Sequence, residues 1–267
     1  HVARPALADH VVPALAVPEA AAATDLREDV RDLLLREVVG AAADLQDVRH
    51  DLVPGAGAQR LLNDVPLGLL EGALPALAGG ALLVGADLLV TTRPEPLRDA
   101  HAVVLPGVGA FDDCIYAIQR QELLDAVKEF IQTGRPFLGI CVGYQALFEK
   151  SEEFNSCAAG LGVFGGKVVR FTERPGLKIP QIGWNRLEIV RPDCPLYAGI
   201  PDGSYVYFVH SFHPQPVDEG IVATRTDYGD HFASSVWRDN VFATQFHPEK
   251  SQAVGLRLLE NFVRLAS

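Results

Sequence analysis

"RPFLGICVGYQALFEK" (residues 135–150) is the stretch that decides the fold. The apolar run "PFLGI" predicts a buried strand, and "VGYQALFEK" (142–150) predicts a helix that follows it directly. Cys141 stands at the junction, between Gly139 and Gly143. In a Gly-x-nucleophile-x-Gly turn, such small residues let the strand and the helix pack closely around strained backbone. Cys141 is therefore either a nucleophile at a helix N-terminus, where the dipole favours a thiolate, or a buried core thiol.

The segments before this turn alternate between strand and helix patterns. "DLLVTT" (87–92) and "HAVVLP" (101–106) have the composition of short buried strands. Residues 111–134 predict one helix that stops at Gly134, because they carry a single apolar stripe: Leu123, Leu124, Val127, Phe130 and Ile131. This alternation favours an α/β fold, a three-layer sandwich with a mostly parallel central sheet.

After residue 150 the sequence becomes rich in strands, which predicts an antiparallel extension of the sheet. A closing helix is expected after Ser251, with Val254, Leu258, Phe262 and Leu265 facing inward. We see no internal repeat and no second domain. The expected strands are 166–173, 186–192, 204–210, 220–226, 231–238 and 241–246.

Composition excludes several classes of function. A net charge of −11 disfavours nonspecific binding to nucleic acid or to an anionic membrane face. No apolar run approaches the roughly 20 residues needed to span a bilayer. The 4 cysteines form no C-x-x-C pair, which argues against a zinc ribbon or a disulfide framework and suits a reducing cytosol. We expect a soluble, cytoplasmic protein with no metal and no cofactor.

Residues 1–84 form an anomalous N-terminal segment. Residues 1–80 contain no Lys, Ile, Phe, Tyr, Trp, Ser, Cys or Met, and apart from Thr24 and Asn63 they use ten amino-acid types, all of which have codons that begin in G or C. A GC-rich gene read in a shifted frame gives this composition, so we expect a mis-framed or disordered segment. A genuine extension is the alternative, because Val30, Leu33, Leu34 and Val38 have helical spacing.

Two further motifs bear on the role of Cys141. In "QFHPEK" (245–250), His247 and Glu249 lie two residues apart on leaving a strand, and Pro248 stiffens the pair. A carboxylate beside a histidine sets its tautomer and stabilises the imidazolium, although a solvated loop remains the alternative. In "LPGVGAFDD" (105–113), two glycines after a strand allow backbone amides to turn toward an anion. A dinucleotide loop would need a third glycine where Asp112 stands.

Together these motifs resemble the class I, or triad, glutamine amidotransferases, and most closely the glutaminase subunits of imidazole glycerol phosphate synthase. The resemblance runs without a gap from about Gly85 to the C-terminus, so residues 85–267 are expected to form the amidotransferase domain. Its markers are "LPGVGAF" (105–111), "GICVGYQALFE" (139–149), "PQIGWN" (180–185), "YFVHSF" (207–212) and "FHPEKSQAVGLRLLENF" (246–262).

The resemblance implies a mechanism. Cys141 would attack the side-chain amide of glutamine, His247 would act as general acid and base, and Glu249 would orient His247. Backbone N–H groups of Val142 and, after a peptide rearrangement, Val108 would stabilise the oxyanion. The resemblance further assigns glutamine binding to Gly109, Gln145, Ser211 and Phe212, and the partner interface to Trp184 and Lys250. The other cysteines would be structural thiols.

The implied partner is a (β/α)8-barrel cyclase subunit in a heterodimer. It would receive the ammonia through a channel and form imidazole glycerol phosphate and AICAR in histidine biosynthesis. A non-catalytic or impaired scaffold of the same fold stays open as an alternative, as does a glutaminase subunit of another amidotransferase. A cysteine peptidase of this fold is disfavoured by "QIGWN" and "HSF".

The chain departs from the family's pattern in two places. The family begins with a strand and a turn of the form "DYG-x-GN", whereas "LNDVPLGLLEGALPALAGG" (62–80) stands in that region here. If the printed segment is genuine, we expect a poorly formed sheet edge and weak or absent coupling to the cyclase. The second departure is Tyr144, where the family usually has methionine. Tyr144 would either influence signalling from the partner or pack in the core.

Overall fold

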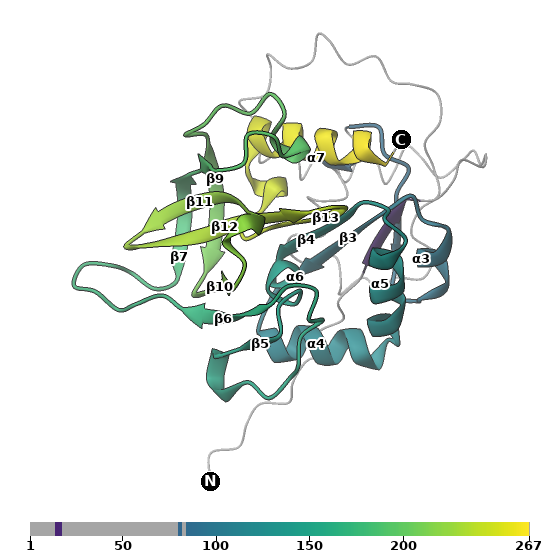
Figure 1. Cartoon of the computed structure of the whole chain (residues 1–267), viewed down its shortest axis with the longest axis horizontal. Helices are drawn as coiled ribbons and strands as arrows, with labels where there is room; N and C mark the ends of the chain where they lie inside the picture. Colours follow the sequence, from purple (N-terminus) through teal and green to yellow (C-terminus); the bar gives the residue numbers. More distant parts are fainter. Residues whose placement is uncertain (1–13, 18–79, 82–83, 267) are drawn as a thin grey trace, which may run out of the picture.

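The computed structural model describes residues 14–17, 80–81 and 84–266, which are drawn as the coloured ribbon in Figure 1. Its largest sheet has eight strands in the order β2-β1-β3-β4-β13-β12-β11-β8. Their bounds are β1 Ala14–Val17, β2 Leu89–Thr91, β3 Ala102–Gly107, β4 Phe137–Cys141, β8 Glu188–Ile189, β11 Val222–Tyr228, β12 Asp230–Arg238 and β13 Val241–Thr244.

Strands β3, β4 and β13 form a parallel centre, and β12, β11 and β8 continue it as the predicted antiparallel extension. Every residue of β3, β4 and β13 is buried, as expected for parallel strands that are covered on both faces. The mixed α/β sandwich expected from the sequence is therefore confirmed.

Strand β1 occupies the position between β2 and β3 and runs antiparallel to both. Ala14–Val17 thus contributes backbone pairing to the sheet, although the sequence offered no reason to place a strand there. The expected helical spacing at Val30–Val38 and the segment 62–79 lie outside the described residues.

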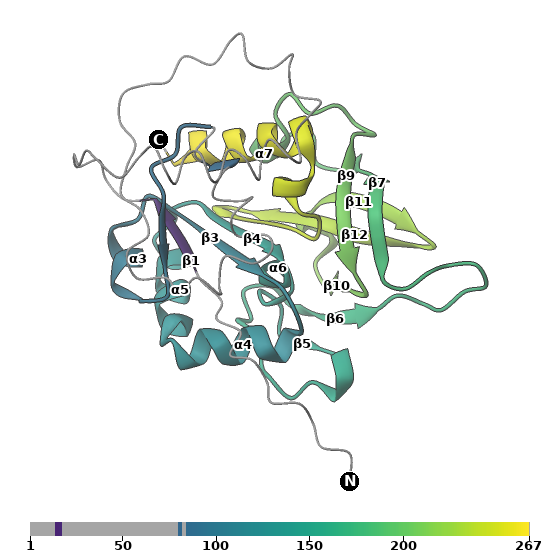
Figure 2. The same cartoon turned by 180° about the vertical axis from the view of Figure 1, so that it is seen from behind.

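Helices cover the two faces of this sheet (Figures 1 and 2). Helix α7 (Gln252–Leu265) lies on one face, and α4 (Phe111–Arg120) and α5 (Leu123–Gln132) lie on the other; α3 (Glu95–Asp99) packs beside α5. The predicted inward residues of α7 are buried at Leu258 and Phe262 and partly buried at Val254 and Leu265. The amphipathic pattern of this helix was therefore interpreted correctly.

The prediction of one helix over 111–134 is wrong, because the chain forms two helices there. Glu122 adopts a left-handed conformation with φ 57°, and the N–H groups of Gln121 and Glu122 close the end of α4 on Ala117 and Gln119. No glycine or proline marks this break in the sequence. The stripe predicted for α5 is buried at Leu123, Val127 and Phe130, so its inward face was predicted correctly.

Two smaller sheets extend the fold beside β11 and β12. One has the order β10 (Phe212–Pro216), β6 (Gly166–Arg170) and β5 (Lys150–Ser151), and the other pairs β7 (Gln181–Arg186) with β9 (Tyr205–His210). Strands β7 and β10 were not predicted as strands. Strand β7 coincides with the motif "PQIGWN", which shows that a motif assignment can hide a strand, and β10 begins at the last residue of "YFVHSF".

Candidate functional site

The turn at Cys141 has the strained geometry that the sequence predicts. Cys141 ends β4 with φ 55° and ψ −110°, and α6 (Val142–Gln145) begins at the next residue. A non-glycine residue in such a region costs about 1–3 kcal/mol and persists only where its surroundings enforce it. Cys141 is 5% exposed, so its thiol is nearly buried.

Close backbone packing enforces this turn. A Cβ added to Gly143 would lie 1.9 Å from the carbonyl oxygen of Leu105 in β3. One added to Gly139 would lie 2.8 Å from the carbonyl oxygen of Gly143. Side chains at either position are excluded, because real Cβ atoms stay at least about 3 Å from such atoms. The two glycines therefore allow β3, β4 and α6 to meet at Cys141.

Helix α6 is shorter than the predicted 142–150. Beyond Gln145, the N–H groups of Leu147 and Phe148 bond to carbonyls only three residues back, as in a tighter 3₁₀ turn. The carbonyls of Ala146, Leu147 and Phe148 accept N–H groups from residues 161–164 instead of continuing the helix. Tertiary hydrogen bonds therefore end a helix that the local sequence favours.

His247 and Glu249 form a buried pair. The turn η5 (Pro248–Lys250) follows His247, and Nδ1 of His247 lies 2.6 Å from Oε1 of Glu249. The side chains are 2% and 1% exposed. Because Glu249 accepts at Nδ1, the proton of a neutral ring sits on that nitrogen, and Nε2 is left for a reacting group. Nε2 has no hydrogen-bond partner of normal geometry among the described residues.

Electrostatic coupling links His247 to Cys141. Burial alone lowers the pKa of His247, but the charge and hydrogen-bonding capacity of the Cys141 sulfur and the contact with Glu249 outweigh burial and raise this pKa to about 10. The cationic ring is thus favoured while a thiolate and a carboxylate flank it. The link between the thiol and the ring is thus electrostatic, since Nε2 makes no hydrogen bond of normal geometry with the described residues.

The backbone of His247 is held from β9. Its N–H donates to the carbonyl of Tyr207 (3.0 Å), and its own carbonyl accepts from Oγ of Ser251 (2.6 Å). Oγ of Ser251 in turn accepts from the N–H of Tyr207 (3.0 Å). Three hydrogen bonds therefore fix the candidate base relative to β9, and no sequence pattern indicated the part played by Ser251.

Two of the residues predicted to bind glutamine, Gln145 and Phe212, are in direct contact. Nε2 of Gln145 donates to the carbonyl of Phe212 (3.0 Å), and both residues are buried near the turn. The carbonyl of Ser211 accepts from the N–H of Phe171, which ties this segment to β6. Val108 and Gly109 follow β3, whose last residue, Gly107, pairs with Cys141 in the sheet.

The segment that joins β3 to α4 (residues 108–110) has a backbone that can rearrange to bind an oxyanion. Val108 is 56% exposed, and Gly109 has φ 90°, a conformation that glycine adopts without strain. Glu153, which no sequence motif marked, holds the end of this segment, because its Oε2 accepts from the N–H of Phe111 at the start of α4 (2.8 Å). Burial is the main reason that the pKa of Glu153 is raised.

A second buried histidine, His210, lies beside Phe212, and both of its ring nitrogens have hydrogen-bond partners. His210 contacts the carbonyl of Phe212 through Nδ1 (2.9 Å) and the side chain of Gln181 through Nε2 (3.0 Å). It lies among aromatic rings, including Phe171 at 5.0 Å between centroids. Burial lowers the pKa of His210 to about 3, so this ring is neutral at physiological pH.

Trp184 and Lys250, the predicted interface residues, meet at one ring. That ring belongs to Tyr207. Its centroid lies 6.0 Å from the centroid of the Trp184 ring and 5.9 Å from Nζ of Lys250. Ile182 (62% exposed), Trp184 (46%) and Tyr205 (49%) leave a large apolar surface on β7 and β9. This surface borders a cavity of about 400 Å³, because Trp184 and Tyr205 also line that cavity.

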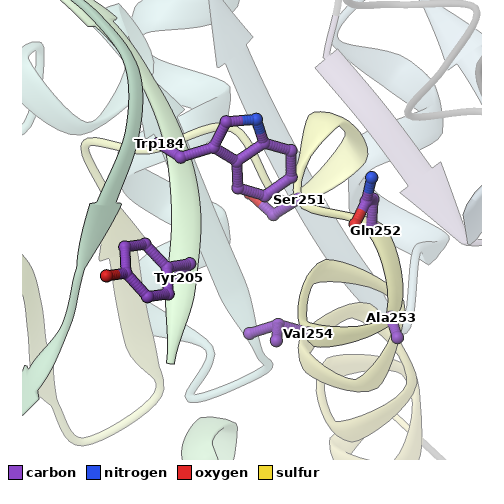
Figure 3. Close-up of a pocket in the computed structure, with 6 residues that line it drawn as sticks. All are labelled: Trp184, Tyr205, Ser251, Gln252, Ala253 and Val254. Atoms are coloured by element: carbon purple, nitrogen blue, oxygen red, sulfur yellow. The ribbon is translucent and has the colours of Figure 1, made fainter. Parts of the chain in front are cut away.

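Figure 3 shows the cavity between the β7–β9 pair and the start of α7. Its walls are Trp184, Tyr205, Ser251, Gln252, Ala253 and Val254. Ser251 also donates to the backbone carbonyl of His247, so one residue both lines the cavity and holds the candidate base. Tyr144 does not reach this surface, because it is fully buried and its hydroxyl donates to the carbonyl of Ala233 (3.2 Å).

The described residues contain no group of three or more His, Cys, Asp or Glu side chains able to hold a metal ion. Within the same part of the chain, no helix has the length and apolar character required to cross a membrane.

The fold agrees with the comparison to known families. The profile of the glutamine amidotransferase class-I family matches residues 87–266, and the chain belongs to this family. A crystal structure of a glutamine amidotransferase, 22% identical, superposes with a TM-score of 0.58 over 74% of this chain and 95% of that chain. It supports the fold alone.

Curated relatives narrow the similarity to one kind of subunit. The chain is 47% identical over 199 residues to imidazole glycerol phosphate synthase subunit HisH of Syntrophotalea carbinolica, covering 72% of this chain and 94% of that protein. It is 50% identical over 197 residues to the subunit of the same name from Chloroflexus aurantiacus, with coverage of 72% and 91%. The resemblance inferred from the sequence motifs is confirmed.

Proposed function

We propose that this chain is the glutamine-hydrolysing subunit of an imidazole glycerol phosphate synthase and supplies ammonia to a cyclase partner in histidine biosynthesis. The observation that carries the proposal is the strained turn at Cys141 together with the buried His247–Glu249 pair. The Cys141 sulfur acts electrostatically on that pair, because it raises the pKa of His247. The intact site favours a catalytic subunit over a scaffold.

The reaction begins with nucleophilic attack. The Cys141 thiolate adds to the side-chain carbonyl of glutamine, and the resulting oxyanion is stabilised by the N–H of Val142 and, after rearrangement of the strand, by that of Val108. His247 as imidazolium gives its proton to the departing amine, which leaves as ammonia. A γ-glutamyl thioester on Cys141 remains.

Water then completes the cycle. Neutral His247 removes a proton from water, the hydroxide adds to the thioester, and glutamate leaves as the Cys141 thiolate is restored. Glu249 holds the ring in one orientation through both steps. The free thiols of this chain require reducing conditions, and we propose the cytoplasm as its location.

We propose that the apolar face of β7 and β9 binds the cyclase, a (β/α)8 barrel. Exposed apolar patches rimmed by polar side chains are typical of protein interfaces, and aromatic residues contribute most of the binding energy there. Trp184 and Tyr205 provide the aromatic anchors, and Lys250 provides a charge at the edge.

The proposal is tested with the purified chain and a cyclase subunit. The wild type is expected to release glutamate and to support synthase activity from glutamine, whereas Cys141→Ala should support it only from added ammonium salt. The doubly substituted Trp184→Ala, Tyr205→Ala chain should lose stimulation by the cyclase. Tyr116→Ala removes an exposed ring on α4 and serves as its control. Equal glutamate release by wild type and Cys141→Ala would reject the proposal.

A further inference from the structure

A buried amide contacts the sulfur of Cys141. Nε2 of Gln245 lies 3.7 Å from Sγ of Cys141, within hydrogen-bonding distance for sulfur. Gln245 is fully buried, and its backbone N–H donates to the carbonyl of Ser234 in β12 (2.8 Å). The residue lies between β13 and His247, so one short segment carries both groups that approach the thiol.

The surrounding hydrogen bonds determine which end of the Gln245 amide faces the sulfur. The carbonyl of Phe212 can only accept, so the atom of Gln145 that contacts it is the NH₂ group. The same NH₂ group lies 3.1 Å from the Gln245 side chain and donates to it, which identifies that atom of Gln245 as Oε1. The other end, the NH₂ group of Gln245, therefore points at the thiol.

We propose that Gln245 is a catalytic residue of this site, a hydrogen-bond donor that stabilises the negative charge on Sγ of Cys141. The inference rests on the proposed role of Cys141 as nucleophile. A hydrogen bond to an ionised acceptor is roughly twice as strong as one between neutral groups, so the N–H of Gln245 favours the thiolate over the thiol. His247 acts on the thiolate through the charge of its ring, and Gln245 acts on it through a hydrogen bond.

A purely structural role for Gln245 makes a different prediction. In that case its amide serves only to pair with Gln145, and its replacement would lower stability without changing the reactivity of the sulfur. The rate at which Cys141 reacts with an alkylating agent separates the two roles, because this rate follows the fraction of thiolate.

The experiment follows alkylation of Cys141 by iodoacetamide from about pH 5 to pH 10, with the modified peptide quantified by mass spectrometry. Gln245→Met removes the donor at similar side-chain length. We expect alkylation of Cys141 to slow about tenfold near neutral pH, as for a lost hydrogen bond to a charged group, and to approach the wild-type rate at high pH. Gln245→Glu, which keeps an acceptor toward Gln145 but brings a carboxylate to the sulfur, should be slower still.

Two controls are built into the chain. Cys157 is exposed and should react at the same rate in every variant, and Gln215→Ala changes an exposed glutamine of β10. Wild-type rates and pH profiles at Cys141 in both Gln245 variants would overturn the proposal. If the methionine variant does not fold, as judged by circular dichroism, the glutamate variant of nearly the same shape decides alone.

This measurement is independent of glutamine turnover. Alkylation needs neither substrate nor cyclase, so a wild-type chain that releases no glutamate would reject the proposed function while leaving the reactivity of the sulfur measurable. Conversely, normal glutamate release with unchanged alkylation in the Gln245 variants would reject only the role of Gln245.

Discussion

Gly143→Ala tests how the fold holds the nucleophile. The added Cβ would lie 1.9 Å from the carbonyl oxygen of Leu105. Real Cβ atoms need about 3 Å, so α6 and β3 must separate by roughly 1 Å. Both partners are backbone, and no side-chain rotation relieves the contact. Cys141 and Val142 would move with α6, because they adjoin it directly.

The expected costs follow from that displacement. Overpacking of this kind costs about 1–3 kcal/mol, which lowers the melting temperature by about 2–12 °C for a domain of this size. A shift of about 1 Å at a reacting group reduces activity by about a hundredfold. Glutaminase activity with the cyclase should therefore fall about a hundredfold or more, while the melting temperature falls by several degrees.

Gly165→Ala is the matched control. Its Cβ would lie 3.9 Å from Val217, an ordinary contact, and its stability should stay equal or rise by about 0.4–1 kcal/mol through a less flexible unfolded chain. Differential scanning calorimetry and a glutamate-release assay give both readouts. Wild-type stability and activity in Gly143→Ala would refute the packing argument.

Three further outcomes are expected. Glu249→Gln should lower the pKa of His247, measured by NMR titration of the ring in a Cys141→Ser background; an unchanged pKa would contradict the role of Glu249. Because the folded pKa of His247 is raised to about 10, its stabilising contribution is complete below the unfolded value of about 6.5 and is lost as pH rises through about 10. Wild type should therefore lose unfolding free energy over this interval, and His247→Gln should lose less in the same denaturant titrations. Leu15→Pro removes an N–H from β1 between its two partner strands and should destabilise the chain by about 1–3 kcal/mol, the cost of leaving a buried backbone group unpaired; unchanged stability would show that Ala14–Val17 adds nothing to the sheet.

The sequence was sufficient where chemistry and packing are local. The glycines at 139 and 143 identified the strand-to-helix turn, because Gly139 must leave room for the backbone of Gly143, and Gly143 for the carbonyl of Leu105 in β3. His247 and Glu249 could be paired because they are neighbours in one short turn. Each of these predictions depended on residues within a few positions of one another.

The predictions that failed depend on distant contacts. The break at Glu122 carries no glycine or proline, and α6 ends because residues 161–164 take the carbonyls that would continue it. Gln245 stood inside a quoted motif, yet its contact with Cys141 joins residues 104 positions apart. The available signal for it was a polar amide side chain between Thr244 and Phe246, directly after a largely apolar strand.

The N-terminal strand illustrates a further limit. Periodicity and composition gave no reason to pair Ala14–Val17 with β2 and β3, because a strand of this length has almost no pattern of its own. Pairing of such a segment is decided by the open backbone groups of its neighbours. Whether residues 1–84 are the natural sequence is a separate matter, decided by peptides from the native protein.

The most direct test of the central claim labels the chain, in the presence of the cyclase, with a glutamine analogue that has an electrophilic side chain. The measurement is the identity of the labelled residue. The account predicts one label per chain, on Cys141, with loss of glutaminase activity in proportion, and no label after Cys141→Ala. Labelling spread over Cys114, Cys157 and Cys194, or full activity after labelling of Cys141, would contradict it.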